Sequence, residues 1–249
     1  MKRIAFLFLT FLLMACSGEK TKAALSIEPV ENFDLTEFNA SVDESVGCPD
    51  LHPVVDDIYL DKHPNLLFVT SNVNKTPGLY MNSIASRPLE FVDDSIYTVR
   101  GEWRVPEDVQ NQQIDINLQL VENDIESHDE ILWDHGETSL NGWVWTRFQD
   151  LTLPEKLFHI GIDHNWHTFQ LVARYQSNPR RRIMQSMMVD DYFSVLNKDM
   201  GILDKGAGWG SSFMLLLETT NKYTNCSTDY NFVGKSFWRN VSVQRTSIP

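Results

Sequence analysis

The chain has 249 residues and a formal net charge of −13, and 42% of its residues are hydrophobic. A chain this acidic is repelled by nucleic acid and by anionic lipid, so neither is expected as a binding partner. The length suits one large β-sandwich or two small domains. Because no second linker and no internal repeat divides the chain, we expect a single domain.

The first sixteen residues predict export from the cytoplasm. Lys2 and Arg3 precede an apolar run, residues 4–13, which is too short to span a bilayer. The run ends in the sequence LMAC, whose last residue is Cys16, and this resembles the lipobox of bacterial lipoproteins. The resemblance implies that residues 1–15 are a signal peptide and that Cys16 is acylated, for example with palmitate. The alternative is an ordinary secretory signal in which the cysteine is incidental.

The same resemblance implies a location in the cell envelope. Ser17 does not resemble the aspartate that retains lipoproteins in the inner membrane, so we expect the outer membrane rather than the inner one. The acyl chains, rather than a basic patch, are expected to hold the protein at the membrane.

The region after the anchor is polar and acidic, so residues 16–45 are predicted to form the lipidated N-terminus and a tether, and residues 46–249 one β-sandwich. Two further cysteines, Cys48 and Cys226, lie near the two ends of that domain. Outside the cytoplasm an isolated pair favours a disulfide, which would stabilise the fold by roughly 4–5 kcal/mol in the chain-entropy model. Neither cysteine has a second ligand at zinc spacing.

Alternation of apolar and polar residues dominates the rest of the chain and predicts β-strands. It is clear in residues 96–105, 114–120 and 166–175. Residues 183–189 and 192–196 flank a short turn and are typical of a hairpin. The continuously apolar residues 213–217 predict a central strand that is buried on both faces, and residues 237–245 a last strand. No stretch of ten or more residues has helical periodicity, so we expect an all-β sandwich or jelly roll.

Three motifs resemble the concanavalin-like lectin and glucanase superfamily. WHTFQLV at residues 166–172 is similar to its W-H-x-x-x-[LV] strand, and MVDDY at 188–192 to the hairpin that follows with a V-D-G turn. Here Asp191 replaces the turn glycine. FWRNVSV at 237–243 resembles the last strand of these proteins. The resemblance covers residues 90–245 and implies a jelly roll that binds saccharide on the concave face of one sheet.

The sequence RGEWR is similar to the R-x-E-L-R strand of jelly-roll alginate lyases, in which such side chains bind uronate carboxylates. This implies that Arg100, Glu102 and Arg104 bind substrate. The amides of Asn117 and Gln119 suit sugar hydroxyls. If the two strands belong to one sheet, all five side chains share one face, and we expect an anionic polysaccharide there. The alternative is a solvated face with cross-strand ion pairs.

The residues that could carry catalysis are fewer. Tyr223 follows a lysine as in the lyases' K-x-G-x-Y strand, where tyrosine donates a proton, and His164 or His167 could act as a base. The lyases' Q-[IV]-H strand and the glucanases' E-[IV]-D-x-x-E signature are both absent. Whether the protein is an enzyme stays open, and a lyase is favoured over a hydrolase.

Two further patterns have a functional and a structural interpretation. Trp143 lies in a loop-rich, tryptophan-containing stretch that could form a platform for sugar rings, although strand tryptophans are commonly buried. The acid pairs at 93–94 and 190–191 could hold a structural calcium ion or simply be solvated in turns. No other cofactor or metal is expected.

Taken together, the sequence predicts a lipid-anchored protein that binds a polysaccharide. The first alternative is a polysaccharide lyase or glycoside hydrolase of the same fold. The second is a structural lipoprotein that binds protein partners through an exposed sheet edge or apolar patch.

Overall fold

The computed structural model describes residues 30–46, 55–63, 66–74, 79–106, 112–135, 142–147, 150–158, 164–204, 208, 210–222 and 231–248. Side chains are described within residues 30–39, 84–106, 114–127, 164–201, 208, 210–219 and 235–248. In this part of the chain, no helix has the length and apolar character needed to cross a membrane. Three predictions fall outside the described residues: the anchor at Cys16, the bridge between Cys48 and Cys226, and the role of Tyr223.

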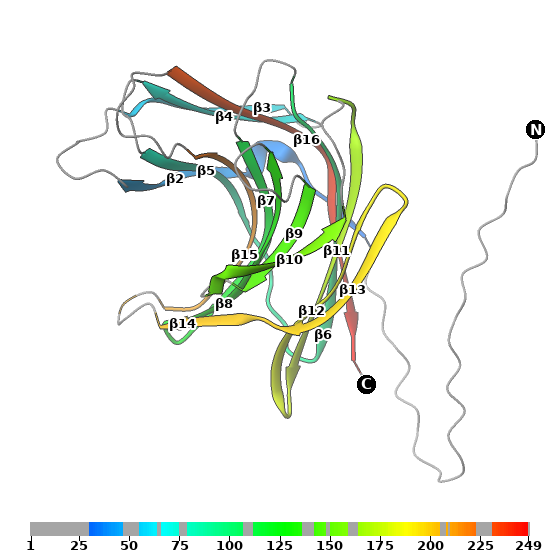
Figure 1. Ribbon diagram of the computed structural model, residues 1–249. Coiled ribbons are helices and arrows are strands. Elements are labelled where there is room, and N and C mark those ends of the chain that lie inside the picture. Colours follow the sequence, from blue (N-terminus) through cyan, green and yellow to red (C-terminus); the bar gives the residue numbers. More distant parts are fainter. Residues whose placement is uncertain are drawn as a thin grey trace, which may run out of the picture.

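Two antiparallel sheets of eight strands make up the structure (Figure 1). The first, sheet A, has the strand order β13-β12-β11-β6-β16-β4-β3, and β1 also pairs with β16. Its strands are β1 (Glu31–Asn32), β3 (Val55–His63), β4 (Leu66–Asn74), β6 (Ser95–Arg104), β11 (His167–Ser177), β12 (Arg180–Val189), β13 (Tyr192–Asp199) and β16 (Asn231–Ser247).

Sheet B has the strand order β10-β9-β8-β7-β15-β5-β2, and β14 also pairs with β8. Its strands are β2 (Asn39–Val46), β5 (Leu79–Pro88), β7 (Gln112–Glu122), β8 (Ile125–His135), β9 (Gly142–Arg147), β10 (Asp150–Phe158), β14 (Gly201–Asp204) and β15 (Ser212–Lys222). The single short 3-10 turn, η1 (Leu35–Glu37), is the only helical element of the described residues. The expected all-β jelly-roll sandwich of two antiparallel sheets is confirmed.

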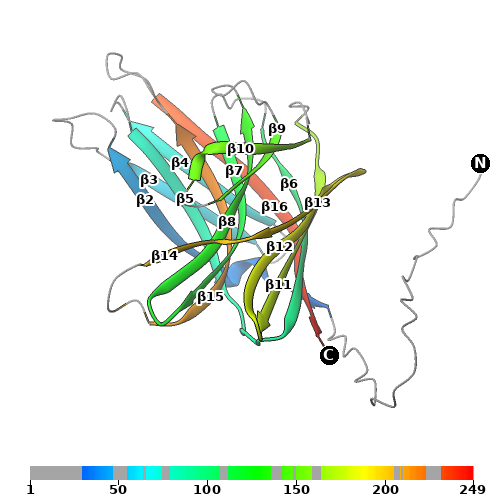
Figure 2. The same cartoon turned by 60° about the horizontal axis from the view of Figure 1, so that its bottom comes forward.

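Figure 1 shows both sheets bent in the same sense, with sheet B on the inside of the bend. The face of sheet B that points away from sheet A, called its outer face below, is therefore concave. The outer face of sheet A is convex. Figures 1 and 2 also show the chain passing from β13 at the edge of sheet A into β14 of sheet B.

The core lies between the two sheets and comes from the inner positions of the alternating strands. On β7 the inner side chains are exposed by 2% or less, and on β11 and β15 the inner positions are similarly buried. Burying a side chain of this size stabilises the fold by roughly 1.5–3 kcal/mol. The large inner residues are Tyr97, Val99, Trp103, Ile114, Ile116, Leu118, Leu120, Phe169, Leu171, Phe213, Leu215, Leu217 and Trp238.

The sandwich begins earlier in the chain than the sequence indicates. Residues 16–45 were predicted to be a tether, but β1 pairs with β16 and β2 pairs with β5. Phe33, Leu35 and Phe38 are buried, with 6%, 1% and 0% exposure. The three apolar residues are not spaced with the period of a strand or a helix, so the sequence pattern does not predict that they pack into the core.

A carboxylate that is paired with two arginines joins the two sheets. Glu122, at the end of β7, accepts hydrogen bonds from Arg182 Nη2 at 2.6 Å and from Arg180 Nη2 at 2.7 Å, and both arginines belong to β12. Burial raises the pKa of Glu122, but the hydrogen bonds from the two arginines outweigh it and the pKa is lowered below its ordinary value. The ionised carboxylate of Glu122 therefore stabilises the folded state.

Candidate functional site

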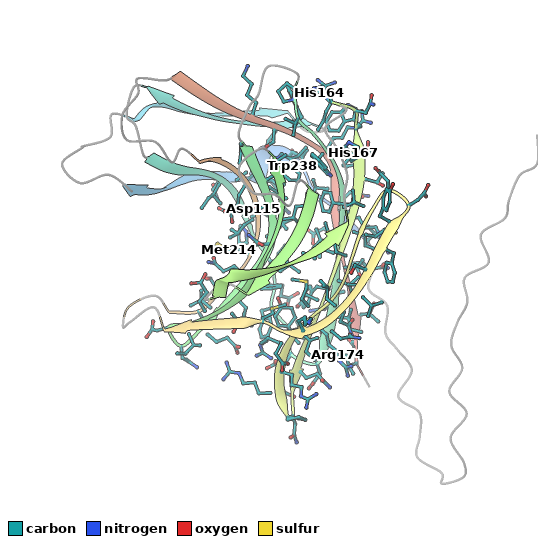
Figure 3. The ribbon with its side chains drawn as sticks, in the orientation of Figure 1. Asp115, His164, His167, Arg174, Met214 and Trp238 are labelled. Carbon is teal, nitrogen blue, oxygen red and sulfur yellow. The ribbon has the colours of Figure 1, made fainter. Side chains whose placement is uncertain are left out.

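The candidate site lies on the outer face of sheet B. Strand β7 alternates there as predicted, with Asp115, Asn117 and Gln119 pointing away from the core. Asp115 and Asn117 are only 4% and 2% exposed, and Gln119 is half-buried. Figure 3 shows Asp115 and Met214 on this side of sheet B, whereas Trp238 lies between the sheets.

Strand β15 supplies the neighbours of this row. Glu218 lies directly opposite Asp115, and Leu216 and Met214 lie opposite Asn117 and Gln119. The Asn117 amide donates to Glu218 Oε1 at 3.3 Å. The predicted burial of this strand on both faces is confirmed at residues 213, 215, 216 and 217, while residue 214 is half-buried.

Strand β8 adds a third carboxylate to the face. Glu126 is 1% exposed, and its Oε1 accepts a hydrogen bond from Gln119 Nε2. Buried polar groups are stable only when they are hydrogen-bonded, and here amides and carboxylates bond to one another across neighbouring strands. Among the described side chains of the face, four are half-buried and three at its ends are exposed: Ile84, Ser86, Gln119 and Met214, and Asn39, Pro88 and Ser212, respectively.

The sequence did not identify Glu218 or Glu126 as site residues. Glu218 directly follows the apolar run 213–217, and continuing the period-two pattern of β15 by one residue places it on the outer face. Glu126 lies at the start of β8, in a stretch where apolar and polar residues do not alternate. Only the pairing of β8 with β7 brings its carboxylate beside Gln119.

The prediction that Arg100, Glu102 and Arg104 share a face with Asn117 and Gln119 is wrong. The arginines and the glutamate lie on β6 of sheet A, and the amides lie on β7 of sheet B. The chain crosses from one sheet to the other between these consecutive strands. The two sets of side chains therefore face opposite sides of the sandwich.

The three residues of β6 lie on the convex outer face of sheet A. Glu102 Oε2 accepts from Arg239 Nε at 2.8 Å and from its Nη2 at 2.6 Å. The Arg100 guanidinium donates to Gln170 Oε1 at 2.7 Å. The Cζ atom of Arg104 lies 4.9 Å from the centroid of the Phe237 ring. This is the solvated, cross-strand-paired face that was the alternative interpretation of the row.

His164 and His167, proposed as bases, lie near the start of β11 in sheet A (Figure 3). His167 is 7% exposed, its Nδ1 is 2.7 Å from Asp190 Oδ2, and its ring stacks on Trp103 with centroids 4.8 Å apart. His164 Nδ1 lies 3.3 Å from a backbone carbonyl oxygen, that of Val105. His167 therefore belongs to the other sheet from the β7 row, and His164 lies just before the same strand.

The two acid pairs hold turns together. Asp190 Oδ1 accepts from the Thr168 amide at 2.8 Å, and Asp94 Oδ1 accepts from the Ser177 amide at 3.0 Å. Hydrogen bonds from the Ser177 side chain and backbone lower the pKa of Asp94. In the part of the chain that the structure describes, no group of three acidic, histidine or cysteine side chains is arranged to hold a metal ion. Trp143 lies on β9, opposite Trp133 of β8, and its side chain is outside the described set.

No protein-family model matches the chain, and no curated protein matches it. Among solved structures, an endo-1,3-beta-glucanase from Streptomyces sioyaensis is similar with a TM-score of 0.42 and 10% identity, over 94% of this chain and 100% of that one. The alginate lyase Aly36B has a TM-score of 0.44 and 7% identity, over 78% and 88%. The carbohydrate recognition domain of Emp47p has a TM-score of 0.37 and 10% identity, over 83% and 95%.

Proposed function

We propose that this protein binds a polysaccharide on the outer face of sheet B and is tethered to the cell envelope through Cys16. The observation that carries the proposal is the row of amides and carboxylates on β7, β8 and β15, centred on Gln119. Gln119 is the half-buried member of this row, and its amide can exchange hydrogen bonds with a sugar hydroxyl, while the buried carboxylates and Asn117 hold the row in place.

The charge of the face favours an uncharged glycan. Asp115, Glu126 and Glu218 contribute three carboxylates to one face, and like charges close together in a partly buried site repel an acidic sugar. The expectation of an anionic polysaccharide depended on Arg100 and Arg104 lying on the same face. Because they lie on the other sheet, that expectation is withdrawn.

A glycoside hydrolase is the second candidate, and one observation favours it over a lyase. Asp115 and Glu218 lie directly opposite each other on neighbouring strands, so two carboxyl groups project from the same face side by side. Retaining glycosidases use a pair of carboxyl groups, one as acid and one as nucleophile. The lyase alternative placed its base at His167, which belongs to β11 of sheet A, or at His164, which precedes the same strand.

A glycan array probed with the chain from residue 17 onward tests the proposal, since this chain keeps every described residue. Gln119→Ala should weaken binding about tenfold, or about 1.4 kcal/mol. Gln170→Ala is the matched control, because Gln170 is also half-buried and hydrogen-bonded to a charged residue, but on the outer face of sheet A.

Reducing-sugar release from the glycans that bind separates binding from hydrolysis. Release that disappears in Asp115→Asn and Glu218→Gln supports the hydrolase. Binding without release supports a binding protein, and an array with no bound glycan contradicts both.

A further inference from the structure

The outer face of sheet A is basic, although the chain as a whole carries a net charge of −13. The strand registers place six cationic residues on this face and four acidic ones, Glu102, Asp199, Asp57 and Asp61. The six cations are Arg100, Arg104, Arg174, Arg181, Lys235 and Arg239. Asp57 and Asp61 belong to β3, at the opposite edge of the sheet from β13, so the cations are concentrated on the part of the face that β6, β11, β12 and β16 form.

Several of these arginines are not neutralised by acids within the described residues. Both acceptors of Arg100 are neutral amides, Gln170 at 2.7 Å and Gln244 at 3.4 Å. Arg104 lies over the ring of Phe237, and among the described residues no carboxylate forms an ion pair with Arg104 or Arg174. These arginines therefore keep a positive charge that no described acid balances.

Exposed apolar side chains continue the same face to its edge. Phe193 and Val195, on edge strand β13, are 59% and 62% exposed. Phe193 lies opposite Met188, and Met188 lies opposite Gln170, which in turn lies opposite Arg100. Directly opposed residues in antiparallel strands project to the same side, so the apolar edge and the basic centre form one surface.

We propose that the outer face of sheet A docks on a membrane surface that contains anionic lipid. The arginines would contact lipid phosphates, while Phe193 and Val195 enter the boundary between headgroups and acyl chains. An acidic polysaccharide would use the arginines but would leave these two apolar side chains in water. The net charge does not prevent docking, because charges more than about 8–10 Å away are screened at physiological salt.

The path of the chain is consistent with this orientation. Residue 30 leads into β1, whose Asn32 pairs with Ser242 of β16, and Ser242 lies opposite Arg100. The segment that precedes the sandwich therefore joins sheet A beside the basic centre. Docking would place the concave face of sheet B away from the lipid. The inference does not depend on the glycan proposal.

Co-sedimentation of the chain from residue 17 onward with lipid vesicles tests the inference, because this chain lacks the acylation site. Vesicles of phosphatidylcholine mixed with phosphatidylglycerol should bind it, and about 1 M salt should release it. Arg100→Ala and Arg174→Ala should each weaken binding roughly fivefold, which corresponds to about 1 kcal/mol for one cation. Phe193→Ser should weaken it roughly tenfold.

Arg180→Ala is the matched control, because Arg180 is exposed but pairs with Glu122 and so lies off the basic face. It should bind like the native chain. Asp191→Asn, which removes an exposed carboxylate in the β12–β13 turn, should bind more tightly. No binding to the mixed vesicles, or equal binding to phosphatidylcholine alone, would overturn the inference. Arginine variants that lose binding while Phe193→Ser keeps it would also overturn it, because that result indicates a general polyanion site.

Discussion

Adding one methyl group at Gly101 tests how tightly β6 packs against its neighbour β11. A Cβ atom at this position would lie 2.6 Å from Cε1 of Phe169 and 2.7 Å from its Cζ, and 3.3 Å from Val241 Cγ2. The ring cannot move away easily, since Phe169 is 2% exposed and packs edge-on against Trp238 with centroids 6.0 Å apart.

We therefore expect Gly101→Ala to destabilise the protein by about 1–3 kcal/mol, the usual cost of overpacking a core. The lower backbone entropy of alanine in the unfolded chain offsets about 0.5–1 kcal/mol of this. Urea unfolding followed by tryptophan fluorescence gives the free energy of unfolding, and the midpoint should fall with an unchanged slope.

A double variant separates steric overlap from other causes. Phe169→Leu removes the ring atoms that the new methyl group would meet, so Gly101→Ala should cost much less in that background. If Gly101→Ala alone leaves the midpoint unchanged or raises it, the packing described for β6 and β11 is wrong.

Three other predictions concern pH, the disulfide and the anchor. Glu122→Gln should make the free energy of unfolding fall less steeply at acid pH. The lowered pKa means that the Glu122 carboxylate stabilises the fold above pH 4.5, its ordinary pKa, and that this contribution is lost as the pH falls through the pKa of the folded state. The same pH dependence in both proteins would contradict this. Mass mapping without reductant should link Cys48 to Cys226, whereas alkylation of both thiols in protein from its native compartment would exclude the bridge. A salt wash should release the Cys16→Ser variant from membranes while the acylated native protein stays bound. A variant with the same mass as the native protein and the same retention on membranes would contradict acylation.

The strands and their inner faces could be predicted from sequence because alternation is a local property. Residues 114–120 have four apolar positions, and each is buried between the sheets. The turn at 190–191 and the two strands beside it were also found, since a short turn fixes the pairing of adjacent strands.

Membership of a sheet could not be predicted in the same way. Alternation shows which residues share a face of one strand, but it does not show which strands lie side by side. Residues 96–105 and 114–120 are consecutive strands, yet β6 pairs with β11 and β16, and β7 pairs with β8 and β15. One neighbour of β7 is the next strand, β8, but the other, β15, comes from a distant part of the sequence, so the contact of Asn117 with Glu218, 101 residues later, is visible only in the structure.

The most direct measurement of the central claim is a crystal structure of the chain from residue 17 onward with an uncharged oligosaccharide that binds on the array. We predict a sugar hydroxyl within about 2.7–3.2 Å of the Gln119 amide, with the ring over β7 and β15. A sugar on the outer face of sheet A, with the carboxylate row of sheet B unchanged, would contradict the assignment of the glycan face.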